Sequence, residues 1–203
     1  MKELVNLFYE IGTLRKIKRS YHINVLQDTE SVAEHSHRAM LISYFLAKKV
    51  GADPYKCILM ASLHDLAEAR TGDSNWVQKS YITQDEDKAT EEQLLPLRDL
   101  SKDLFRLLSE YKERKTLESQ VTKDADNIEY VLSLRELELT GNKEATRRLN
   151  SENTFLDKLF TEEAKAIVIL IKKTGPTEWT QKDLRISHKS YKEFAKSKKS
   201  PKR

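Results

Sequence analysis

The sequence predicts an all-α protein, a helical bundle folded as a single domain. Apolar residues recur at spacings of three and four over most of the chain, which is the period of an amphipathic helix. The 203 residues include 5 Gly and 4 Pro, and most of these fall between the periodic stretches, where they separate one helix from the next. A chain of this length is sufficient to close one core around a buried polar site.

The first expected helix spans about residues 4–14 and carries one apolar stripe that packs on the core. The stripe consists of Leu4, Leu7, Phe8, Ile11 and Leu14. A basic stretch over residues 15–19 follows, and residues 21–30 show no helical period. We therefore expect a loop between the first helix and the second.

A second helix is expected to begin after Ser31, because Ser31 and Glu34 match the capping-box pattern. Its inward face carries His35, Ala39, Ile42, Leu46 and Val50. Gly51 ends this helix, and Pro54 begins the next one. The first histidine of interest is thus predicted to face the core from the beginning of a helix.

The third helix is expected over residues 54–69, with His64 and Asp65 near its C-terminal end. Residues 71–73 break it, and the chain from 73 to 85 is irregular, which makes this segment a candidate lid. Its expected apolar anchors are Trp76, Val77, Tyr81 and Ile82.

The second half of the chain predicts further helices. One spans residues 88–108 with an interruption near Pro96, and a long one spans 115–139, contains Asp126 and stops at residues 140–142. A last strong helix covers residues 161–173, and a short amphipathic piece is expected around Tyr191 and Phe194. The apolar side of the 161–173 helix consists of Ala164, Ile167, Val168 and Ile171.

The net charge of +4 is concentrated at the C-terminal end. Residues 188–203 contain seven Lys or Arg and one Glu, so residues 1–187 carry a net charge of −2. We expect residues 1–187 to form the domain and 188–203 to be a flexible basic tail. This distribution argues against a nucleic-acid-binding surface on the domain and leaves weak contact through the tail as the alternative.

Cys57 is the single cysteine, so no intramolecular disulfide can form and a reducing, cytoplasmic setting is expected. Its apolar neighbours predict a buried structural thiol. The N-terminus lacks the features of a signal peptide, and the longest apolar run, residues 166–171, is too short to span a bilayer. We expect no membrane association.

Two imidazoles and two carboxylates are predicted to lie on helices with apolar faces: His35, His64, Asp65 and Asp126. A mixed shell of nitrogen and oxygen donors suits divalent Mn, Co, Fe, Zn or Mg. Spacing alone leaves open a hydrogen-bonded core histidine for His64 and a solvated position for Asp126. Helical periodicity also does not select Asp126 over Asp124.

Three segments that contain these residues resemble motifs of a known family. Residues 31–36, 64–73 and 123–126 are similar, in order and spacing, to the motif segments of the HD-domain metal-dependent phosphohydrolases, and most of all to the HD-type 5'-deoxynucleotidases. The second segment includes a Glu and a Gly-Asp pair at the family offsets, and the similarity extends from about residue 4 to residue 172.

The resemblance implies an all-α bundle of the HD type that acts as a homodimeric enzyme and removes phosphate from nucleoside 5'-monophosphates. It implies a divalent metal cofactor with four protein ligands, namely His35, His64, Asp65 and Asp126. It also implies catalytic roles for Glu68 and Asp73. Glu68 is expected to handle the proton, whereas Asp73 could orient water, protonate the leaving 5'-oxygen or bind the sugar.

Arg19 and Tyr21 are the candidate substrate-binding residues. Arg19 precedes the first motif by the length of a loop and offers a cation for the phosphate. Related enzymes have Arg-Trp in this stretch, whereas this chain has Arg19-Ser20-Tyr21-His22, so Tyr21 is the candidate replacement for the Trp.

Two other functions remain open from the sequence. Another HD phosphohydrolase would act on alarmones, cyclic nucleotides or deoxynucleoside triphosphates. Ala69 argues against the first of these, because alarmone hydrolases usually have an acidic pair at Glu68 and the next position. A non-catalytic module would instead use the fold and the basic tail to bind nucleic acid or a protein partner.

Overall fold

A computed structural model of the chain describes residues 1–151 and 155–179. Within these ranges the protein consists of α-helices and 3-10 turns, with one isolated β-bridge between Lys18 and Ser31 and no strand. The α-helices are α1 (Lys2–Ile11), α2 (His22–Val25), α3 (Val32–Val50), α4 (Pro54–Leu63), α5 (Glu68–Thr71), α6 (Glu86–Leu94), α7 (Lys102–Glu113), α8 (Leu117–Leu139), α9 (Lys143–Asn150) and α10 (Glu162–Lys173). The all-α prediction is confirmed.

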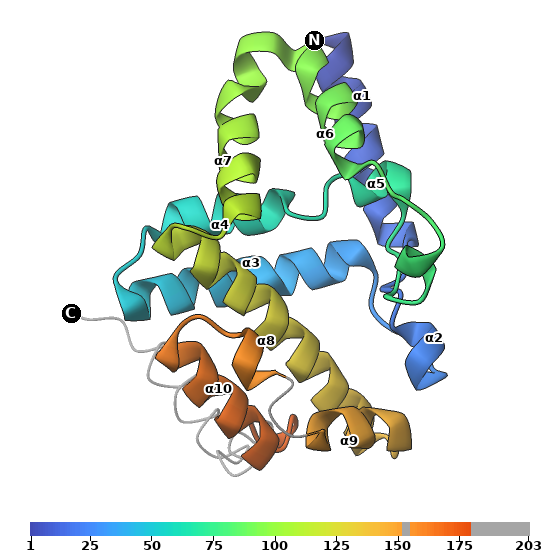
Figure 1. Cartoon of the computed structure of the whole chain (residues 1–203), viewed down its shortest axis with the longest axis vertical. Helices are drawn as coiled ribbons and strands as arrows, with labels where there is room; N and C mark the ends of the chain where they lie inside the picture. The colour runs from blue at the N-terminus through green and yellow to red at the C-terminus, as the bar shows by residue number, and fades with distance from the viewer. Residues whose placement is uncertain (152–154, 180–203) are drawn as a thin grey trace, which may run out of the picture.

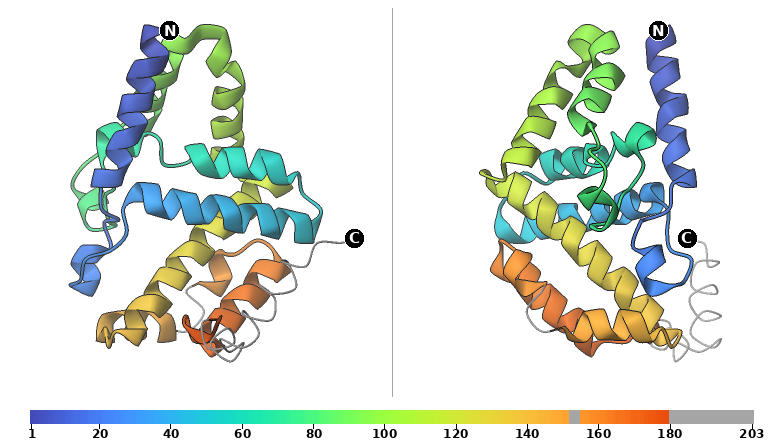
Figure 2. Two further views of the ribbon diagram at one scale, coloured as in Figure 1. Left: turned by 180° about the vertical axis from the view of Figure 1, so that it is seen from behind. Right: turned by 45° about the vertical axis from the view of Figure 1, so that its right-hand side comes forward.

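Helices α3, α4 and α8 form the middle of the molecule. α3 and α4 lie side by side, and α8 crosses them, so that α3 packs against both of the others (Figure 1). α1, α6 and α7 stand together at one end, and α9 and α10 cover the other end (Figure 2). The first turn of α3, the C-terminal end of α4 and the middle of α8 therefore meet in the interior.

Two apolar clusters hold this arrangement. The central cluster, between α3, α4, α8, α9 and α10, includes Leu46, Cys57, Val121, Ile128, Val131 and Val168. The second, under α1, α6 and α7, consists of Leu7, Leu66, Leu94, Leu97 and Leu108. Burial of each such aliphatic side chain contributes about 1.5–3 kcal/mol to folding.

The capping box at the start of α3 is confirmed. The backbone N–H of Glu34 donates to the Ser31 hydroxyl at 3.3 Å, and the Glu34 carboxylate accepts from the Ser31 backbone N–H at 2.7 Å. Gly51 ends the helix in the left-handed region, with φ of 82°. The box fixes where α3 begins, and so places His35 in its first turn.

The expected continuous helix over residues 54–69 is wrong at its C-terminal end. α4 stops at Leu63, and the chain passes through tight turns before α5. In these turns the N–H of Leu66 donates to Leu63 O at 3.0 Å and that of Glu68 to Asp65 O at 3.1 Å, a spacing of three residues rather than four. On a regular helix, neighbours such as His64 and Asp65 point about 100° apart. The break lets both side chains face the same point.

The expected anchors of the candidate lid are also wrong. Trp76 is 70% exposed, and the other three proposed anchors are exposed as well. Polar side chains hold the segment instead. Asn75 Oδ1 accepts from the N–H groups of Val77 and Gln78, and Gln84 Nε2 donates to two carbonyls at the C-terminal end of α5. Phe8, expected in the apolar stripe of α1, is 60% exposed.

The last helix agrees with the prediction, whereas α9, and α2 within the expected loop over residues 21–30, were not predicted. α10 begins after Thr161, whose side chain accepts from the N–H of Ala164, and it buries Ala164, Val168 and Ile171. The expected piece around Tyr191 and Phe194 and the basic tail over 188–203 lie outside the described residues. Among the helices that the structure describes, none combines the length and the apolar character needed to cross a membrane.

Candidate active site

The four predicted metal ligands lie together although they come from distant parts of the chain. His35 Nε2 lies 3.2 Å from Asp126 Oδ1 and 3.6 Å from Asp65 Oδ2. His64 Nε2 lies 3.2 Å from Asp65 Oδ2 and 3.9 Å from Asp126 Oδ1. The first turn of α3, the turn after α4 and the middle of α8 thus bring two imidazoles and two carboxylates to one point.

The protonation of His64 follows from its contacts. Its Nδ1 lies 2.7 Å from the carbonyl oxygen of Ala61, which can only accept, so Nδ1 must carry the proton. Burial lowers the pKa of His64 and so favours the neutral ring, in which Nε2 presents a lone pair; this atom lies 3.3 Å from Nε2 of His35.

His35 is completely buried and is contacted on both ring nitrogens. Its Nδ1 makes a short hydrogen bond with the carboxylate of Glu129, on the side away from His64. If Nδ1 donates there, the Nε2 atoms of His35 and His64 face each other with two lone pairs, beside the carboxylates of Asp65 and Asp126. This arrangement is repulsive unless a positive charge lies between them.

The pKa values indicate the same need for positive charge. Burial lowers the pKa of His35, but hydrogen bonds with Asp126 and Glu129 outweigh it and raise the pKa to about 10. For Asp126, burial alone would raise the pKa, but Lys123 and the two histidines hold it well below its usual range. The surroundings thus keep the carboxylate charged and favour a cation at the imidazoles.

These residues fit a divalent metal ion. Donor atoms of His35, His64 and Asp126 all lie within 4.8 Å of one another, and Asp65 Oδ2 adjoins both imidazoles. Imidazole nitrogen and carboxylate oxygen form the donor set of many catalytic divalent ions. The observed donor chemistry therefore agrees with the metal dependence expected from the sequence.

Arg19 lies between the carboxylates rather than at an open surface. Its Nη1 is 3.0 Å from Asp65, 3.3 Å from Asp73 and 3.9 Å from Glu68. Burial lowers the pKa of Arg19, but these negative charges outweigh it and raise the pKa. Asp73 is held in addition by the backbone N–H and the hydroxyl of Ser20, at 2.9 and 3.0 Å. Arg19 thus links both predicted catalytic acids to the predicted ligand Asp65.

Glu68 carries a polar atom that the described protein groups leave unsatisfied. Its Oε2 is buried and accepts no hydrogen bond from the described residues. Burial, and then the charges of Asp65 and Asp73, raise the pKa of Glu68 to about 9. A carboxyl group in such a position can hold or release a proton.

Tyr21 is not brought into this cluster. Its side chain is buried in the central core, where its ring packs edge-on against Tyr130 with centroids 4.9 Å apart. Its hydroxyl donates to Glu30 at 2.6 Å. The proposed contact between Tyr21 and substrate stays a prediction.

Asp124 and Asp126 have different surroundings in the structure, a difference that the helical period of the sequence did not predict. Asp124 accepts from the N–H of Phe160 at 2.8 Å and from the N–H and hydroxyl of Thr161 at 2.9 and 2.7 Å. Asp124 therefore anchors the start of α10, and Asp126 faces the histidines.

A cavity of about 200 Å³ opens beside the cluster. His64, Asp65, Glu68 and Asp126 contribute to its wall. Basic and aromatic residues that were not among the predicted site residues also line it, namely Lys79, Tyr111, Lys112, Arg114 and Lys123. Lys123, in the quoted 123–126 segment, was the one available signal, and its Nζ lies 2.6 Å from Asp126 Oδ2.

Tyr111 and Arg114 shape the wall of this cavity together. The ring of Tyr111 packs edge-on against His64, with centroids 5.7 Å apart. The Arg114 guanidinium lies over the same ring, 3.3 Å from its centroid. The wall of the cavity thus combines the predicted metal ligands with positively charged side chains.

Comparison with known proteins places these observations in a family context. The sequence profile of the HD domain matches residues 11–168, a range that contains all four predicted ligands. The 5'-deoxynucleotidase HDDC2 of Bos taurus is 29% identical over 148 residues, which make up 70% of this chain and 71% of the relative. The 5'-deoxynucleotidase HDDC2 of Dictyostelium discoideum is 30% identical over 152 residues, or 68% of this chain and 79% of the relative.

Solved structures show the same similarity. A conserved hypothetical protein from Pyrococcus furiosus superposes with a TM-score of 0.67 at 30% identity, over 84% of this chain and 99% of that chain.

Proposed function

The chain belongs to the HD domain family and is a metal-dependent phosphohydrolase, and we propose that it hydrolyses deoxyribonucleoside 5'-monophosphates to nucleoside and phosphate. The relatives named 5'-deoxynucleotidase support this substrate class. The observation that carries the proposal is the convergence of His35, His64, Asp65 and Asp126 beside a cavity with basic residues in its wall.

In the proposed reaction His35, His64, Asp65 and Asp126 hold the divalent ion. When bound, such an ion lowers the pKa of water and offsets negative charge on a phosphate oxygen. The protein's own contribution begins with Ala61, whose carbonyl oxygen accepts from Nδ1 of His64 and so keeps Nε2 of that ring oriented toward the common point.

Glu68 is the proposed proton-handling group. Glu68 lines the cavity and its Oε2 has no hydrogen-bond partner among the described residues, so the carboxyl group is available to pass a proton between water and the leaving group. In the net reaction the water oxygen bonds to phosphorus, the bond from phosphorus to the 5'-oxygen breaks, and a proton ends on that oxygen. Asp73 acts beside it, and Arg19 keeps both acids in place through its ion pairs.

The phosphate dianion is proposed to lie against the basic wall. Lys79, Arg114 and Lys123 reach this wall from different elements, and Arg114 is pre-positioned by its stacking on Tyr111. Arg19 is proposed as a further phosphate contact. Its Nη1 lies 3.0 Å from Asp65, a predicted metal ligand, and is therefore close to the point where the phosphate would meet the ion.

A homodimer is also proposed. Exposed apolar side chains gather on the outer faces of α3 and α4, where the ring of Tyr44 contacts those of Phe45 and Tyr55. The large exposed residues of these two helices are Leu41, Phe45, Tyr55 and Leu59. Burial of such a patch between two copies would stabilise the dimer. Light scattering at several protein concentrations tests this.

Phosphate release from a panel of nucleotides tests the proposed function. We expect release from deoxyribonucleoside 5'-monophosphates with Mn or Co, none after chelation, and none from the Asp65→Ala variant. Asp103→Asn, an exposed acid on α7, is the matched control and should retain activity. Hydrolysis restricted to triphosphates, cyclic nucleotides or alarmones, or activity that survives both chelation and Asp65→Ala, would overturn the proposal.

A further inference from the structure

Glu129 is a buried carboxylate that the reaction described above does not itself use. It lies on α8 one turn after Asp126 and is 1% exposed. A charged carboxylate in the interior destabilises the fold unless partners compensate for the lost hydration. The contacts of Glu129 therefore indicate its structural role.

The two oxygens of Glu129 have different partners. Oε2 is hydrogen-bonded to Nδ1 of His35. Oε1 accepts from Nε of Arg38 at 2.8 Å, pairs with its Nη2 at 2.7 Å, and accepts from the Ser133 hydroxyl at 3.2 Å. The carboxylate is thus fixed from one side while it contacts the histidine with the other.

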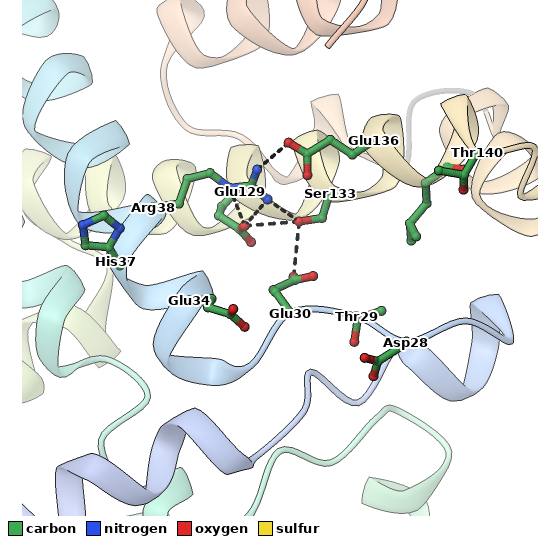
Figure 3. A pocket seen from close by; sticks show the side chains of 11 residues that line it. Asp28, Thr29, Glu30, Glu34, His37, Arg38, Glu129, Ser133, Glu136 and Thr140 are labelled. Atoms are coloured by element: carbon green, nitrogen blue, oxygen red, sulfur yellow. Dashed lines mark hydrogen bonds and ion pairs between the residues drawn. The ribbon is translucent and has the colours of Figure 1, made fainter. Parts of the chain in front are cut away.

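Arg38 and Ser133 belong to a network that reaches the surface. Arg38 Nη1 pairs with Glu136 at 2.6 Å, and the Ser133 hydroxyl also lies 3.2 Å from Glu30 Oε1. These groups line a cavity of about 510 Å³, separate from the one beside Asp126, and Figure 3 shows them converging there. Two nitrogens of Arg38 thus hold one oxygen of the Glu129 carboxylate in place from the side opposite His35.

We infer that Glu129, held by Arg38, is a positioning residue that orients His35 and keeps its Nε2 free to bind the metal. The inference rests on the proposed role of His35 as a ligand. A carboxylate behind a ligating histidine fixes the ring and raises the basicity of the other nitrogen. Because α8 carries both Asp126 and Glu129, one helix sets a ligand and the residue behind another ligand in a fixed relation.

A second metal ion is the alternative use of the same carboxylate. Donor atoms of Glu30, His35 and Glu129 also lie within 4.8 Å of one another. The guanidinium of Arg38 already occupies Glu129 Oε1, and its charge would repel a further cation there. The geometry therefore favours orientation of His35 over binding of a second ion.

Metal binding by the Glu129→Gln variant tests the inference. Titration calorimetry with Mn should show one ion per chain in the wild type and a dissociation constant raised about 10–100-fold in the variant. Glu136→Gln is the matched control, since it removes the other carboxylate on Arg38 without contacting His35, and its dissociation constant should equal that of the wild type. Equal affinity in Glu129→Gln and wild type, or two ions per chain in the wild type, would overturn the inference.

A measurement on the wild type covers the case in which Glu129→Gln fails to fold. Proton NMR of the zinc-loaded protein should show the His35 Nδ1 proton shifted further downfield than the His64 Nδ1 proton, because the first is bonded to a carboxylate and the second to the neutral carbonyl of Ala61. Equal chemical shifts of the two protons would contradict the inference. Absence of any metal binding by the wild type would instead contradict the proposed function, so the two failures are distinguishable.

Discussion

Asp124 and Asp126 lie two residues apart on α8, yet their side chains bind different parts of the molecule. Asp124 is fully buried and accepts three hydrogen bonds from Phe160 and Thr161, whereas Asp126 faces His35 and His64. The first aspartate joins α10 to the bundle, and the second belongs to the candidate metal centre. Substitution of Asp126 should therefore affect metal binding, and substitution of Asp124 should affect stability.

Asp126→Asn should lose metal binding and phosphate release while its unfolding temperature in the presence of chelator stays close to that of the wild type. Asp124→Asn should retain metal-dependent activity in the folded fraction but lose about 1–3 kcal/mol of stability, because buried donors at the start of α10 lose their acceptor. Chemical denaturation and metal titration of both variants check this. Equal effects of the two substitutions on metal affinity would contradict the assignment.

Glu68→Gln should lower kcat by about 100- to 10,000-fold, the range expected when a general acid or base is removed. Metal affinity should change little, since the ligands are untouched. Steady-state kinetics alongside calorimetric metal binding separate the two effects. The control is Glu92→Gln, an exposed acid on α6, and a Glu68→Gln enzyme as active as this control would rule out the proposed role.

The capping box of α3 predicts a pH-dependent contribution to stability. Ser31→Ala should cost about 1 kcal/mol, because the N–H of Glu34 loses its acceptor. Hydrogen bonds from the backbone and the hydroxyl of Ser31 lower the pKa of Glu34. A lowered folded-state pKa means that the contribution is present above the unfolded-state pKa and is lost as the pH falls through the folded-state value.

Denaturation of wild type and Ser31→Ala at pH 7 and at pH 3 measures this contribution. The difference in the free energy of unfolding between wild type and Ser31→Ala should be smaller at pH 3 than at pH 7. Ser80→Ala, at an exposed serine, should show no difference at either pH, and a Ser31→Ala difference that grows on acidification would refute the prediction.

Cys57 should be unreactive in the folded protein. It is fully buried in the central cluster, and burial raises the pKa of its thiol to about 12. At pH 8 only about one thiol in ten thousand would be ionised, compared with roughly a quarter for a free cysteine. Because the chain has a single cysteine, labelling with a thiol reagent should follow global unfolding, and rapid labelling of the native protein would contradict this.

Much of the fold could be predicted from local signals. The capping box at Ser31 and Glu34, the break at Gly51 and Pro54, and the apolar side of α10 each depend on neighbours within a few residues. The short helix α9 was missed, although Asn142 caps it by accepting from the N–H of Ala145. Most of its residues are polar, and Ala145 and Leu149, its two buried residues, are too few to show a helical period in the sequence.

The features that could not be predicted depend on tertiary contacts. α4 ends at Leu63, and this end lets the side chains of His64 and Asp65 face one point. The apolar period of the sequence continues past Leu63 and does not predict the end. The role of Glu129 could not be predicted from its neighbours in the sequence, because its partners His35 and Arg38 lie more than 90 positions earlier in the chain. Tyr21 packs in the central core, which its neighbours in the sequence did not indicate, and its proposed contact with substrate stays a prediction.

The central claim is that His35, His64, Asp65 and Asp126 bind one divalent ion. Anomalous diffraction from crystals soaked in Mn tests it most directly. The account predicts one strong peak about 2.0–2.3 Å from His35 Nε2, His64 Nε2 and carboxylate oxygens of both aspartates. A peak that lies elsewhere, or one that leaves Asp126 outside coordinating distance, would contradict it.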